Sequence, residues 1–332
     1  NPPGTTYTVS FNDGSLPITY NHPPPSSVTH TFLKTSCGTT STVTSTYNNS
    51  FFASIVAENP CDKSAATVVP IRVSTIAVPS FQVPQTIKCT GNQICITNTS
   101  TGGDSASSSS CSNPKIIWTI SPSTGFTLAS GSLGNDFGSA NTNSWISGSN
   151  SICPIFSVAG TYSITMKIGN RCGIEEITKT ICIESPLVPQ FTLNNSVSCA
   201  PASIGTTNTT VETNLCTATT YLWNVTYTNA NCGTSISPIT DQTTKDATYN
   251  FTVPGTYSIK LTATNSCGSV STSQTVTIKK PPTISAINGI LSNYCGPTTI
   301  NPTVTVNACT PSTGTLSYAW SFPGDTPAVS TT

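Results

Sequence analysis

Hydrophobic and polar residues alternate in three segments of the chain. In residues 257–264, hydrophobic side chains from Tyr257 to Ala263 alternate with Ser, Lys and Thr, and the same period of two recurs in residues 162–168 and 51–57. This period predicts a β-strand with one face buried and the other in water. We therefore expect one equivalent strand, with the same inward face, at three places.

A second alternating segment follows each of these strands after a turn, and predicts the last strand of each unit. Its paired hydrophobic positions are Val276 and Ile278, Ile181 and Ile183, and Ile71 and Val73. Large aromatic residues, Trp118, Trp223 and Trp320, lie in short apolar segments upstream. We expect them in the core, where a large ring fills the space between two sheets.

An internal repeat sets the size of the unit. Residues 160–164 and 255–259 both read Gly-Thr-Tyr-Ser-Ile, and each is followed by an Asn-x-Cys-Gly turn. The period is 105 residues from Trp118 to Trp223 and 97 from Trp223 to Trp320. Such a period is typical of one β-sandwich per repeat. The fold class predicted is all-β, with tandem immunoglobulin-like β-sandwich domains in an extended array.

Proline-containing linkers follow the β-patterned segments, at Val78-Pro79, Ser185-Pro186 and Lys280-Pro281. Proline cannot continue a β-ladder, and it stiffens a linker. The predicted domains are residues 1–77 (partial), 78–185, 186–280 and 281–332 (partial). We expect them to form a semi-rigid array that continues beyond this chain.

The charge and hydropathy of the chain argue against nucleic acid and membranes as partners. Only 7% of the residues are charged, 12 basic against 12 acidic. This balance offers no field to hold nucleic acid or an anionic membrane. No apolar run approaches the roughly 20 residues of a membrane-spanning helix, and we expect no membrane insertion. Any export signal or anchor is expected outside this chain.

The chain has 14 cysteines and a single methionine. No cysteines show the CxxC spacing of zinc or thioredoxin-like sites, which favours disulfides formed in an oxidising compartment. The predicted domains hold two, six, four and two cysteines, so every bridge can close within one domain. Equivalence between the units predicts Cys37 with Cys61, Cys89 with Cys111, Cys95 with Cys182, Cys153 with Cys172, Cys199 with Cys216, Cys232 with Cys267, and Cys295 with Cys309. In this alignment Cys95 takes the place of the apolar Ile204.

Several motifs resemble those of PKD domains, the immunoglobulin-like modules named after polycystic kidney disease. Residues 10–14 (Ser-Phe-Asn-Asp-Gly) resemble the family's Trp-x-Phe-Gly-Asp-Gly turn, residues 29–32 its His-x-Tyr element, and residues 255–265 its Gly-x-Tyr strand. Residues 118–121 and 223–226 depart from the turn motif. Long PKD arrays with Cys in the Asn-x-Cys-Gly turn are similar to giant surface proteins of Bacteroidota, including gliding-motility adhesins exported by type IX secretion. The resemblance implies a filament that grips a substratum.

The resemblance also implies one modification site. Residues 104–106 read Asp-Ser-Ala, in a loop rich in Gly and Ser, and they resemble the O-glycosylation sequence of that phylum. Ser105 is therefore the predicted glycan carrier.

The sequence holds no pattern typical of a catalytic site. His22 and His30 are the only histidines, so a Ser-His-Asp or Cys-His arrangement cannot recur in each unit. Adjacent residues of a strand point to opposite faces, so Glu175 and Glu176 cannot form a cooperating acid/base pair. We expect no enzyme activity.

No cofactor is expected, and turn-bound calcium is the one alternative. Asn12 with Asp13, or Asp325, could contribute to such a site, but stabilisation of a turn by the Asp side chain is favoured.

Three functions compete on this basis. The first is a structural repeat segment of a secreted cell-surface adhesin, extracellular in location, that attaches to a surface or polysaccharide and acts in gliding motility. Its contacts with the secretion and motility machinery would lie outside this chain, and its exposed edge strands would allow self-association. The second is a spacer or carbohydrate-binding array attached to a secreted hydrolase. The third, a catalytic domain, is disfavoured, because repetition of a module with few charged residues is typical of a protein that spans a distance and not of a catalytic site.

Overall fold

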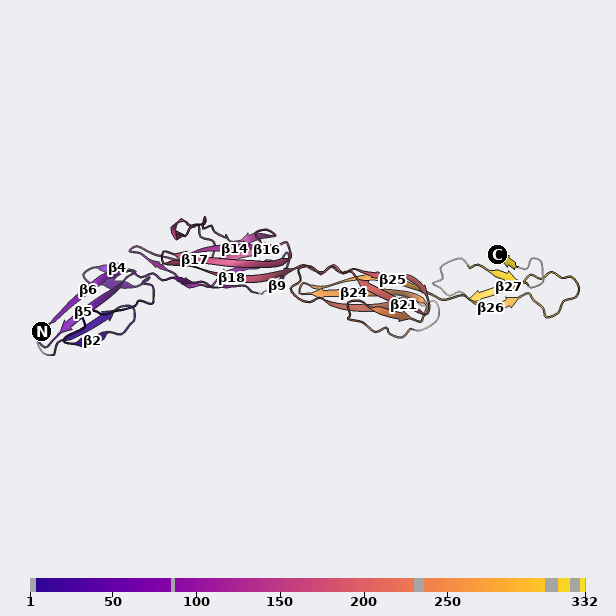
Figure 1. Cartoon of the computed structure of the whole chain (residues 1–332), viewed down its shortest axis with the longest axis horizontal. Coiled ribbons are helices and arrows are strands. Elements are labelled where there is room, and N and C mark those ends of the chain that lie inside the picture. Colours follow the sequence, from indigo (N-terminus) through magenta and orange to yellow (C-terminus); the bar gives the residue numbers. More distant parts are fainter. Residues whose placement is uncertain (1–3, 85–86, 230–235, 308–315, 323–328, 332) are drawn as a thin grey trace. The chain divides into compact units, whose positions relative to one another are not determined.

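A computed structural model describes residues 4–84, 87–229, 236–307, 316–322 and 329–331 (Figure 1). These residues form β-strands and one short 3-10 helix, η1 (Thr142–Ser144), with no α-helix among them. The chain divides into two compact units, residues 1–185 and 186–332. It is an all-β protein built from tandem immunoglobulin-like β-sandwich units, as the alternation predicted.

The second module, residues 77–184, is a sandwich of two four-stranded sheets. One sheet has the order β14-β17-β18-β9, with β9 parallel to β18. Its strands are β14 (Lys115–Ser121), β17 (Gly160–Asn170), β18 (Gly173–Glu184) and β9 (Ile87–Cys89). The other sheet has the order β15-β16-β10-β8. Its strands are β15 (Phe126–Ser130), β16 (Ser151–Phe156), β10 (Ile96–Asn98) and β8 (Phe81–Gln82).

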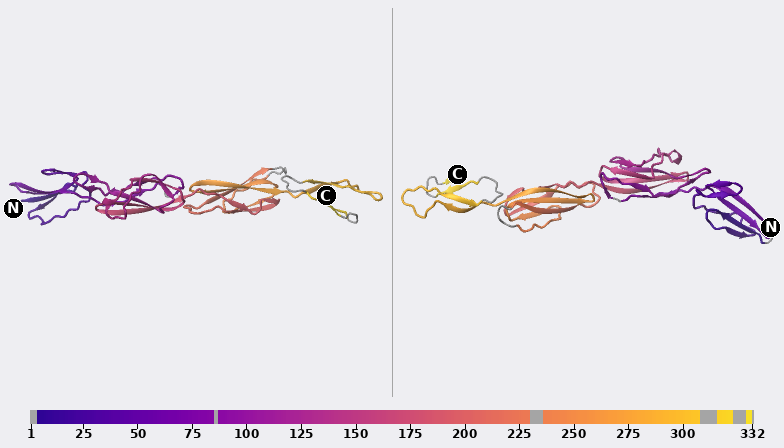
Figure 2. Two further views of the ribbon diagram at one scale, coloured as in Figure 1. Left: turned by 90° about the horizontal axis from the view of Figure 1, so that it is seen from above. Right: turned by 180° about the vertical axis from the view of Figure 1, so that it is seen from behind.

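The third module, residues 191–279, repeats this arrangement (Figure 2). One sheet has the order β20-β25-β24-β22, and β20 is again parallel to its neighbour. Its strands are β20 (Val197–Cys199), β25 (Gly268–Lys279), β24 (Gly255–Asn265) and β22 (Thr220–Asn229). The other sheet, β19-β21-β23, consists of β19 (Phe191–Leu193), β21 (Ala202–Asn208) and β23 (Thr248–Phe251).

The first module, residues 6–71, and the C-terminal segment, residues 283–331, are simpler. The first module has one sheet, β2-β1-β5-β6, and a hairpin, β3-β4. Their bounds are β1 (Thr6–Phe11), β2 (Ile18–Asn21), β3 (Thr40–Thr42), β4 (Thr46–Asn48), β5 (Phe51–Glu58) and β6 (Lys63–Ile71). The C-terminal segment pairs β26 (Thr283–Asn288) with β27 (Thr303–Asn307), and β28 (Ala319–Ser321) with β29 (Val329–Thr331).

Two of the three tryptophans fill the two cores, as predicted, whereas Trp320 in β28 is only half-buried. Trp118 is 2% exposed and Trp223 is fully buried. Each ring meets a phenylalanine edge to face, Phe81 at 5.4 Å and Phe191 at 5.0 Å between centroids. Each indole N–H also donates to a backbone carbonyl, so the one polar atom of each ring has a partner.

The repeated Gly-Thr-Tyr motif has a structural role. The Tyr162 hydroxyl donates to the Val158 carbonyl at 3.0 Å, and the Tyr257 hydroxyl to the Val253 carbonyl at 2.6 Å. Burial raises the pKa of Tyr257 to about 12. A side chain at Gly255 would overlap the ring of Tyr227, so glycine is required there. The motif closes the loop that enters the long inner strand, β17 or β24.

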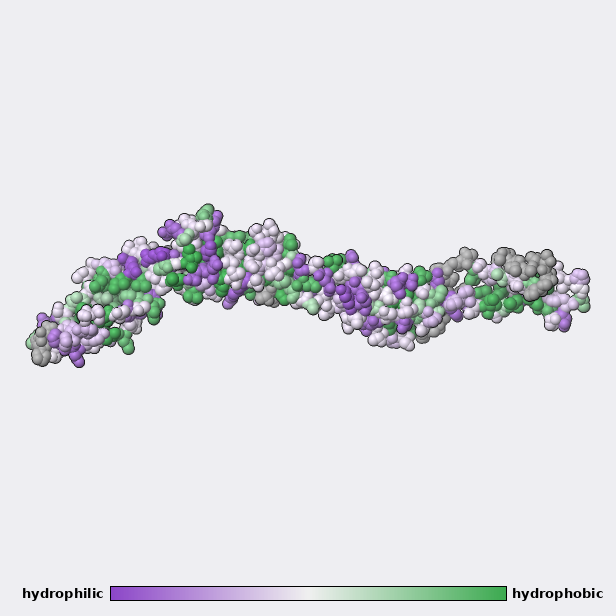
Figure 3. Space-filling view, in the orientation of Figure 1, coloured by the Kyte–Doolittle hydropathy of each residue, from purple (hydrophilic) through white to green (hydrophobic). Residues whose placement is uncertain are grey.

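The predicted inward face holds in two of the three strands. In β17 and β24 the hydrophobic positions of the alternation are at most 2% exposed. In β5 the prediction is wrong beyond Phe51, because Ile55 is 39% exposed. The described part of the first module has no second full sheet to cover this strand. In the C-terminal segment, exposed hydrophobic side chains such as Ile284 and Ile287 gather over β26 and β27 (Figure 3).

Candidate functional site: the joint between the first and second modules

The linker of residues 72–76, between β6 and the short strand β7 (Ala77–Val78), is held by the turn between β17 and β18. The Asn170 side-chain amide donates to the carbonyls of Thr75, at 2.7 Å, and Gly103, at 2.6 Å. Its Oδ1 accepts from the Cys172 backbone N–H at 2.8 Å. Asn170 is 9% exposed, so its side chain is enclosed and bonded at both ends. The first residue of the Asn-x-Cys-Gly turn thus fixes the linker.

Arg171, the next residue, holds a second point of the linker. Its guanidinium donates to Ser74 Oγ, at 2.6 Å from Nη2, and to the Ala106 carbonyl at 2.8 Å. Ser74 Oγ also accepts from the Ala106 N–H. Ala106 belongs to the hairpin of β12 (Ser105–Ala106) and β13 (Cys111–Ser112). Linker, turn and hairpin therefore share one hydrogen-bond network.

The first module contacts this network from the other side. Thr35 Oγ1 donates to the carbonyls of Val73, at 3.1 Å, and Asp104, at 3.3 Å. The Asn49 side chain donates to the Ser107 carbonyl, at the tip of the β12-β13 hairpin. The contacts of Thr35 with Asp104 and of Asn49 with Ser107 join residues that lie 69 and 58 positions apart in the chain.

A disulfide closes the joint: Cys37 of the first module is bonded to Cys111 of the second, with 5.7 Å between their Cα atoms. The predicted pairs Cys37–Cys61 and Cys89–Cys111 are therefore wrong. Cys61 lies exposed in the turn between β5 and β6. Cys111 sits in β13, and the hairpin of β13 docks on the loop that carries Cys37. The prediction assumed that every bridge closes within one domain, and the docked hairpin removes that assumption.

A second bridge also differs from the prediction: Cys95 is bonded to Cys153, with 4.1 Å between the Cα atoms. Pairs of Cys95 with Cys182 and of Cys153 with Cys172 are therefore wrong. In the antiparallel pair β10-β16, Ile96 is opposite Ile152, so the preceding and following cysteines also face each other.

The alignment of Cys95 with Ile204 was wrong by one residue. Ile94, not Cys95, is the buried counterpart of Ile204, at 1% and 0% exposed respectively. A shift of one position turns a strand residue to the other face.

The remaining cysteines that the structure describes divide into two groups. Cys89, Cys182, Cys216 and Cys267 are also disulfide-bonded. Cys61, Cys172, Cys199 and Cys295 are free and exposed, so the predicted pairs Cys199–Cys216 and Cys295–Cys309 are wrong. Cys232 and Cys309 lie outside the described residues, so the bridge of Cys232 with Cys267 stays a prediction.

The predicted glycan carrier, Ser105, lies at the joint. It is half-buried in β12, opposite Ser112, and directly follows Asp104, whose carbonyl binds Thr35. Glycosylation of Ser105 stays a prediction.

The candidate calcium turn is stabilised by side chains. Oδ1 of Asp13 accepts hydrogen bonds from the backbone N–H and the hydroxyl of Ser15, and Oδ2 lies 2.7 Å from His30 Nε2. The His30 ring stacks on Phe11 at 3.7 Å. Asn12 is engaged with Ser41 and the Phe52 N–H. These bonds support the predicted turn role, whereas Asp325 lies outside the described residues. Among the residues that the structure describes, no three His, Cys, Asp or Glu side chains form a metal-binding group.

This turn predicts a pH effect on the first module. The hydrogen bonds from Ser15 and His30 lower the pKa of Asp13 to about 2. A lowered folded-state pKa gives stability that is present above the unfolded value of about 3.9 and is lost as pH falls toward 2. We expect the free energy of unfolding to fall by about 1–2 kcal/mol over this range, allowing for solvent screening. Urea titrations at pH 5 and pH 2.5 measure it. Asp13→Asn should remove the part of this dependence that Asp13 contributes, and an unchanged dependence in that variant would contradict the assignment.

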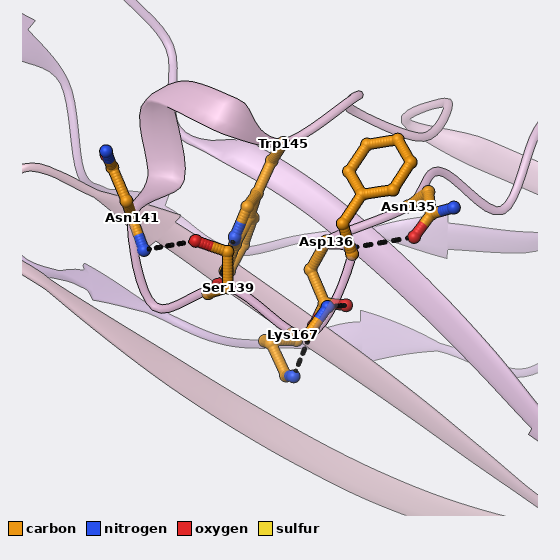
Figure 4. Close-up of polar contacts among 8 residues, drawn as sticks. Asn135, Asp136, Ser139, Asn141, Trp145 and Lys167 are labelled. Atoms are coloured by element: carbon orange, nitrogen blue, oxygen red, sulfur yellow. Dashed lines mark hydrogen bonds and ion pairs between the residues drawn. The ribbon is translucent and has the colours of Figure 1, made fainter.

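In the second module, polar side chains hold the loop of residues 131–149 in place (Figure 4). The ring of Trp145, a residue of this loop, is buried, and its N–H donates to the Ser139 carbonyl at 2.7 Å. Lys167 of β17 binds Asp136 at 2.7 Å, and the pKa of Asp136 is lowered by this bond. Asn135 and Ile146 exchange backbone hydrogen bonds, which close the loop's neck. None of these residues was predicted from the sequence.

No helix in the described ranges has the length and apolar character to span a membrane.

Both histidines are in structural contacts, His22 Nδ1 with the Tyr7 hydroxyl at 3.1 Å and His30 with Asp13.

The chain matches no protein-family model and no curated protein. Solved structures of tandem immunoglobulin-like domains are similar to it at low identity. A titin I-band fragment, I67–I69, is 16% identical, with 63% of this chain and 68% of that chain covered and a TM-score of 0.37. The N-terminal eight Ig domains of DSCAM are 13% identical, with 69% and 28% covered and a TM-score of 0.40, so this chain spans under a third of that fragment. The Escherichia coli adhesin FdeC is 10% identical, with 68% and 73% covered and a TM-score of 0.36.

Proposed function

We propose that this chain is a structural repeat segment of a secreted adhesin on the cell surface, in which disulfides make the array a load-bearing rod. The observation that carries the proposal is the Cys37–Cys111 bond between two modules. Disulfides persist in oxidising, extracellular settings. When the chain is pulled, the Cys37–Cys111 disulfide also carries force between the two modules, so the hydrogen bonds of the linker do not bear it alone.

The finer parts of the proposal rest on the sequence. PKD-type modules, export by type IX secretion and a role in gliding motility follow from the Asn-x-Cys-Gly and Gly-Thr-Tyr motifs. At the joint, the Asn of this motif has a structural role, because the Asn170 side chain binds the Thr75 carbonyl of the preceding linker. Within the turn, the hydrogen bond that the Cys172 N–H donates to Asn170 Oδ1 recurs from Cys61 to Asn59 and from Cys267 to Asn265. The absence of enzyme activity is part of the proposal.

The alternative is a spacer or carbohydrate-binding array beside a secreted hydrolase. Fab fragments raised against residues 186–280 distinguish the two. An adhesin segment predicts that the fragments label intact, unpermeabilised cells and reduce attachment to surfaces. A hydrolase spacer predicts that the antigen is in the medium and is captured together with hydrolase activity. Labelling only after permeabilisation would contradict both.

A further inference from the structure

An open groove of about 470 Å³ lies on the second module, beside the joint. Its walls come from the turn after β10, the segment before β12, the residues before β14 and the end of the loop of residues 131–149. The residues that matter for the argument are Asn98, Asp104, Asn113, Ile116, Ser147 and Asn150. Nothing in the proposed rod function uses this groove.

The polar groups of the groove fall into two sets. Asn98 and Asn150 are tied to each other, with Nδ2 of Asn98 donating to Oδ1 of Asn150 at 2.9 Å. Ser147 Oγ accepts from the Ile116 N–H at 3.0 Å. The Asp104 carboxylate and the Asn113 amide have no hydrogen-bond partner among the described residues. One wall is therefore preorganised, and the other presents a free acceptor and a free amide.

The composition of the groove narrows the class of ligand. Among the described residues that line it there is no Lys or Arg, so phosphate and other anions have no counter-charge. A single carboxylate does not make a cation site, since Ca²⁺ takes 6–8 oxygen ligands, several of them carboxylates. Its lining is mainly polar, which disfavours an apolar ligand. Amides, hydroxyls and one carboxylate, together with the apolar Ile116, match a ligand with many hydroxyl groups and no charge.

We propose that this groove binds a neutral oligosaccharide. Asp104 accepts hydrogen bonds from two sugar hydroxyls, Asn113 donates to a third, and Ile116 lies under the apolar face of the ring. The proposal names the ligand class of the adhesin proposed above and in that sense rests on it.

The third module provides an internal comparison. Trp118 and Trp223 are equivalent, so Tyr221 takes the place of Ile116. The Tyr221 hydroxyl donates to Glu212 at 2.6 Å and lowers the pKa of that carboxyl, and Lys245 lies 3.7 Å from the same side chain. At the place where the second module leaves an open groove, the third module thus has a Tyr-Glu-Lys cluster. This difference supplies a blocking substitution, Ile116→Tyr.

The test uses the full oxidised chain on an array of oligosaccharides of two to six residues. The neutral set contains glucose, mannose, galactose and N-acetylglucosamine oligomers, and oligogalacturonate and heparin fragments are the anionic set. We expect retention of at least one neutral oligomer, whose dissociation constant is then measured by calorimetry. Asp104→Ala should weaken it about tenfold or more, because a charge-assisted hydrogen-bond pair is lost. Asn113→Ala should weaken it about threefold to tenfold, and Ile116→Tyr should abolish binding.

Asn92→Ala, an exposed asparagine of the same module outside the groove, is the matched control and should leave binding unchanged. Circular dichroism of each variant separates loss of the site from loss of the fold, and the two alanine variants keep the test valid if Ile116→Tyr unfolds. Retention of no neutral oligomer, preference for the anionic set, or binding that is unaffected by both Asp104→Ala and Asn113→Ala would overturn the proposal. None of these results depends on surface labelling, so the adhesin proposal can fail or survive separately.

Discussion

Replacing Cys37 and Cys111 together by serine is expected to lower the free energy of unfolding of residues 1–185 by about 4 kcal/mol. The bridge closes a loop with a sequence separation of 74. In the chain-entropy model, a cross-link over a loop of this length restricts the unfolded chain by that amount. The bond also connects two modules, so its loss should uncouple their unfolding. Denaturant titration of the oxidised chain and of the double variant measures both effects.

The free cysteines provide the control. Cys61→Ser and Cys172→Ser remove exposed thiols without a bridge and should change the free energy of unfolding by less than about 0.5 kcal/mol. A large loss in Cys61→Ser, with none in Cys111→Ser alone, would show that Cys61, not Cys111, is the partner of Cys37.

Substitution of Trp223 by alanine is expected to cost the third module about 3–5 kcal/mol. The ring is fully buried, packs against Phe191 and donates to the Thr244 carbonyl. Alanine leaves a cavity between the sheets and a carbonyl without its donor. A thermal melt should then show the third module unfolding well before residues 1–185.

Trp223→Phe is the conservative comparison, because it keeps most of the aromatic volume and loses the N–H. It should cost clearly less than alanine. Equal losses in the two variants would mean that the hydrogen bond, not the packing of the ring, dominates. An unchanged melt in Trp223→Ala would contradict the core assignment of this residue.

The strands could be predicted because a period of two reports burial directly. Tyr257, Ile259 and Leu261 lie in a sheet covered by another, and each is at most 1% exposed. The same pattern misled at Ile55, because alternation identifies a face that can be buried but not whether a second sheet lies over it. Whether a second sheet covers the strand depends on residues far away in the chain.

The disulfides could not be predicted from spacing. The pair Cys95–Cys153 depends on the register of β10 against β16, and an alignment error of one residue moved Cys95 to the wrong face. The pair Cys37–Cys111 depends on docking of the β12-β13 hairpin against the first module, which involves hydrogen bonds to the backbone carbonyls of Asp104 and Ser107. Backbone carbonyls have no sequence signature. Asn170 and Arg171 were recognised as parts of a repeated turn, but their partners across the joint were not.

Single-molecule pulling on the full chain from its two ends tests the load-bearing joint most directly. In the oxidised protein, tension passes from Cys37 to Cys111 through the disulfide, so the 74-residue loop cannot extend. At roughly 3.5 Å per residue, loss of the bridge should add between ~100 Å and ~250 Å of contour length on unfolding, less than the full loop because Cys95–Cys153 overlaps it. The account predicts this increase for the Cys37→Ser/Cys111→Ser variant and none for Cys61→Ser. Equal contour lengths for the oxidised protein and the double variant would contradict it.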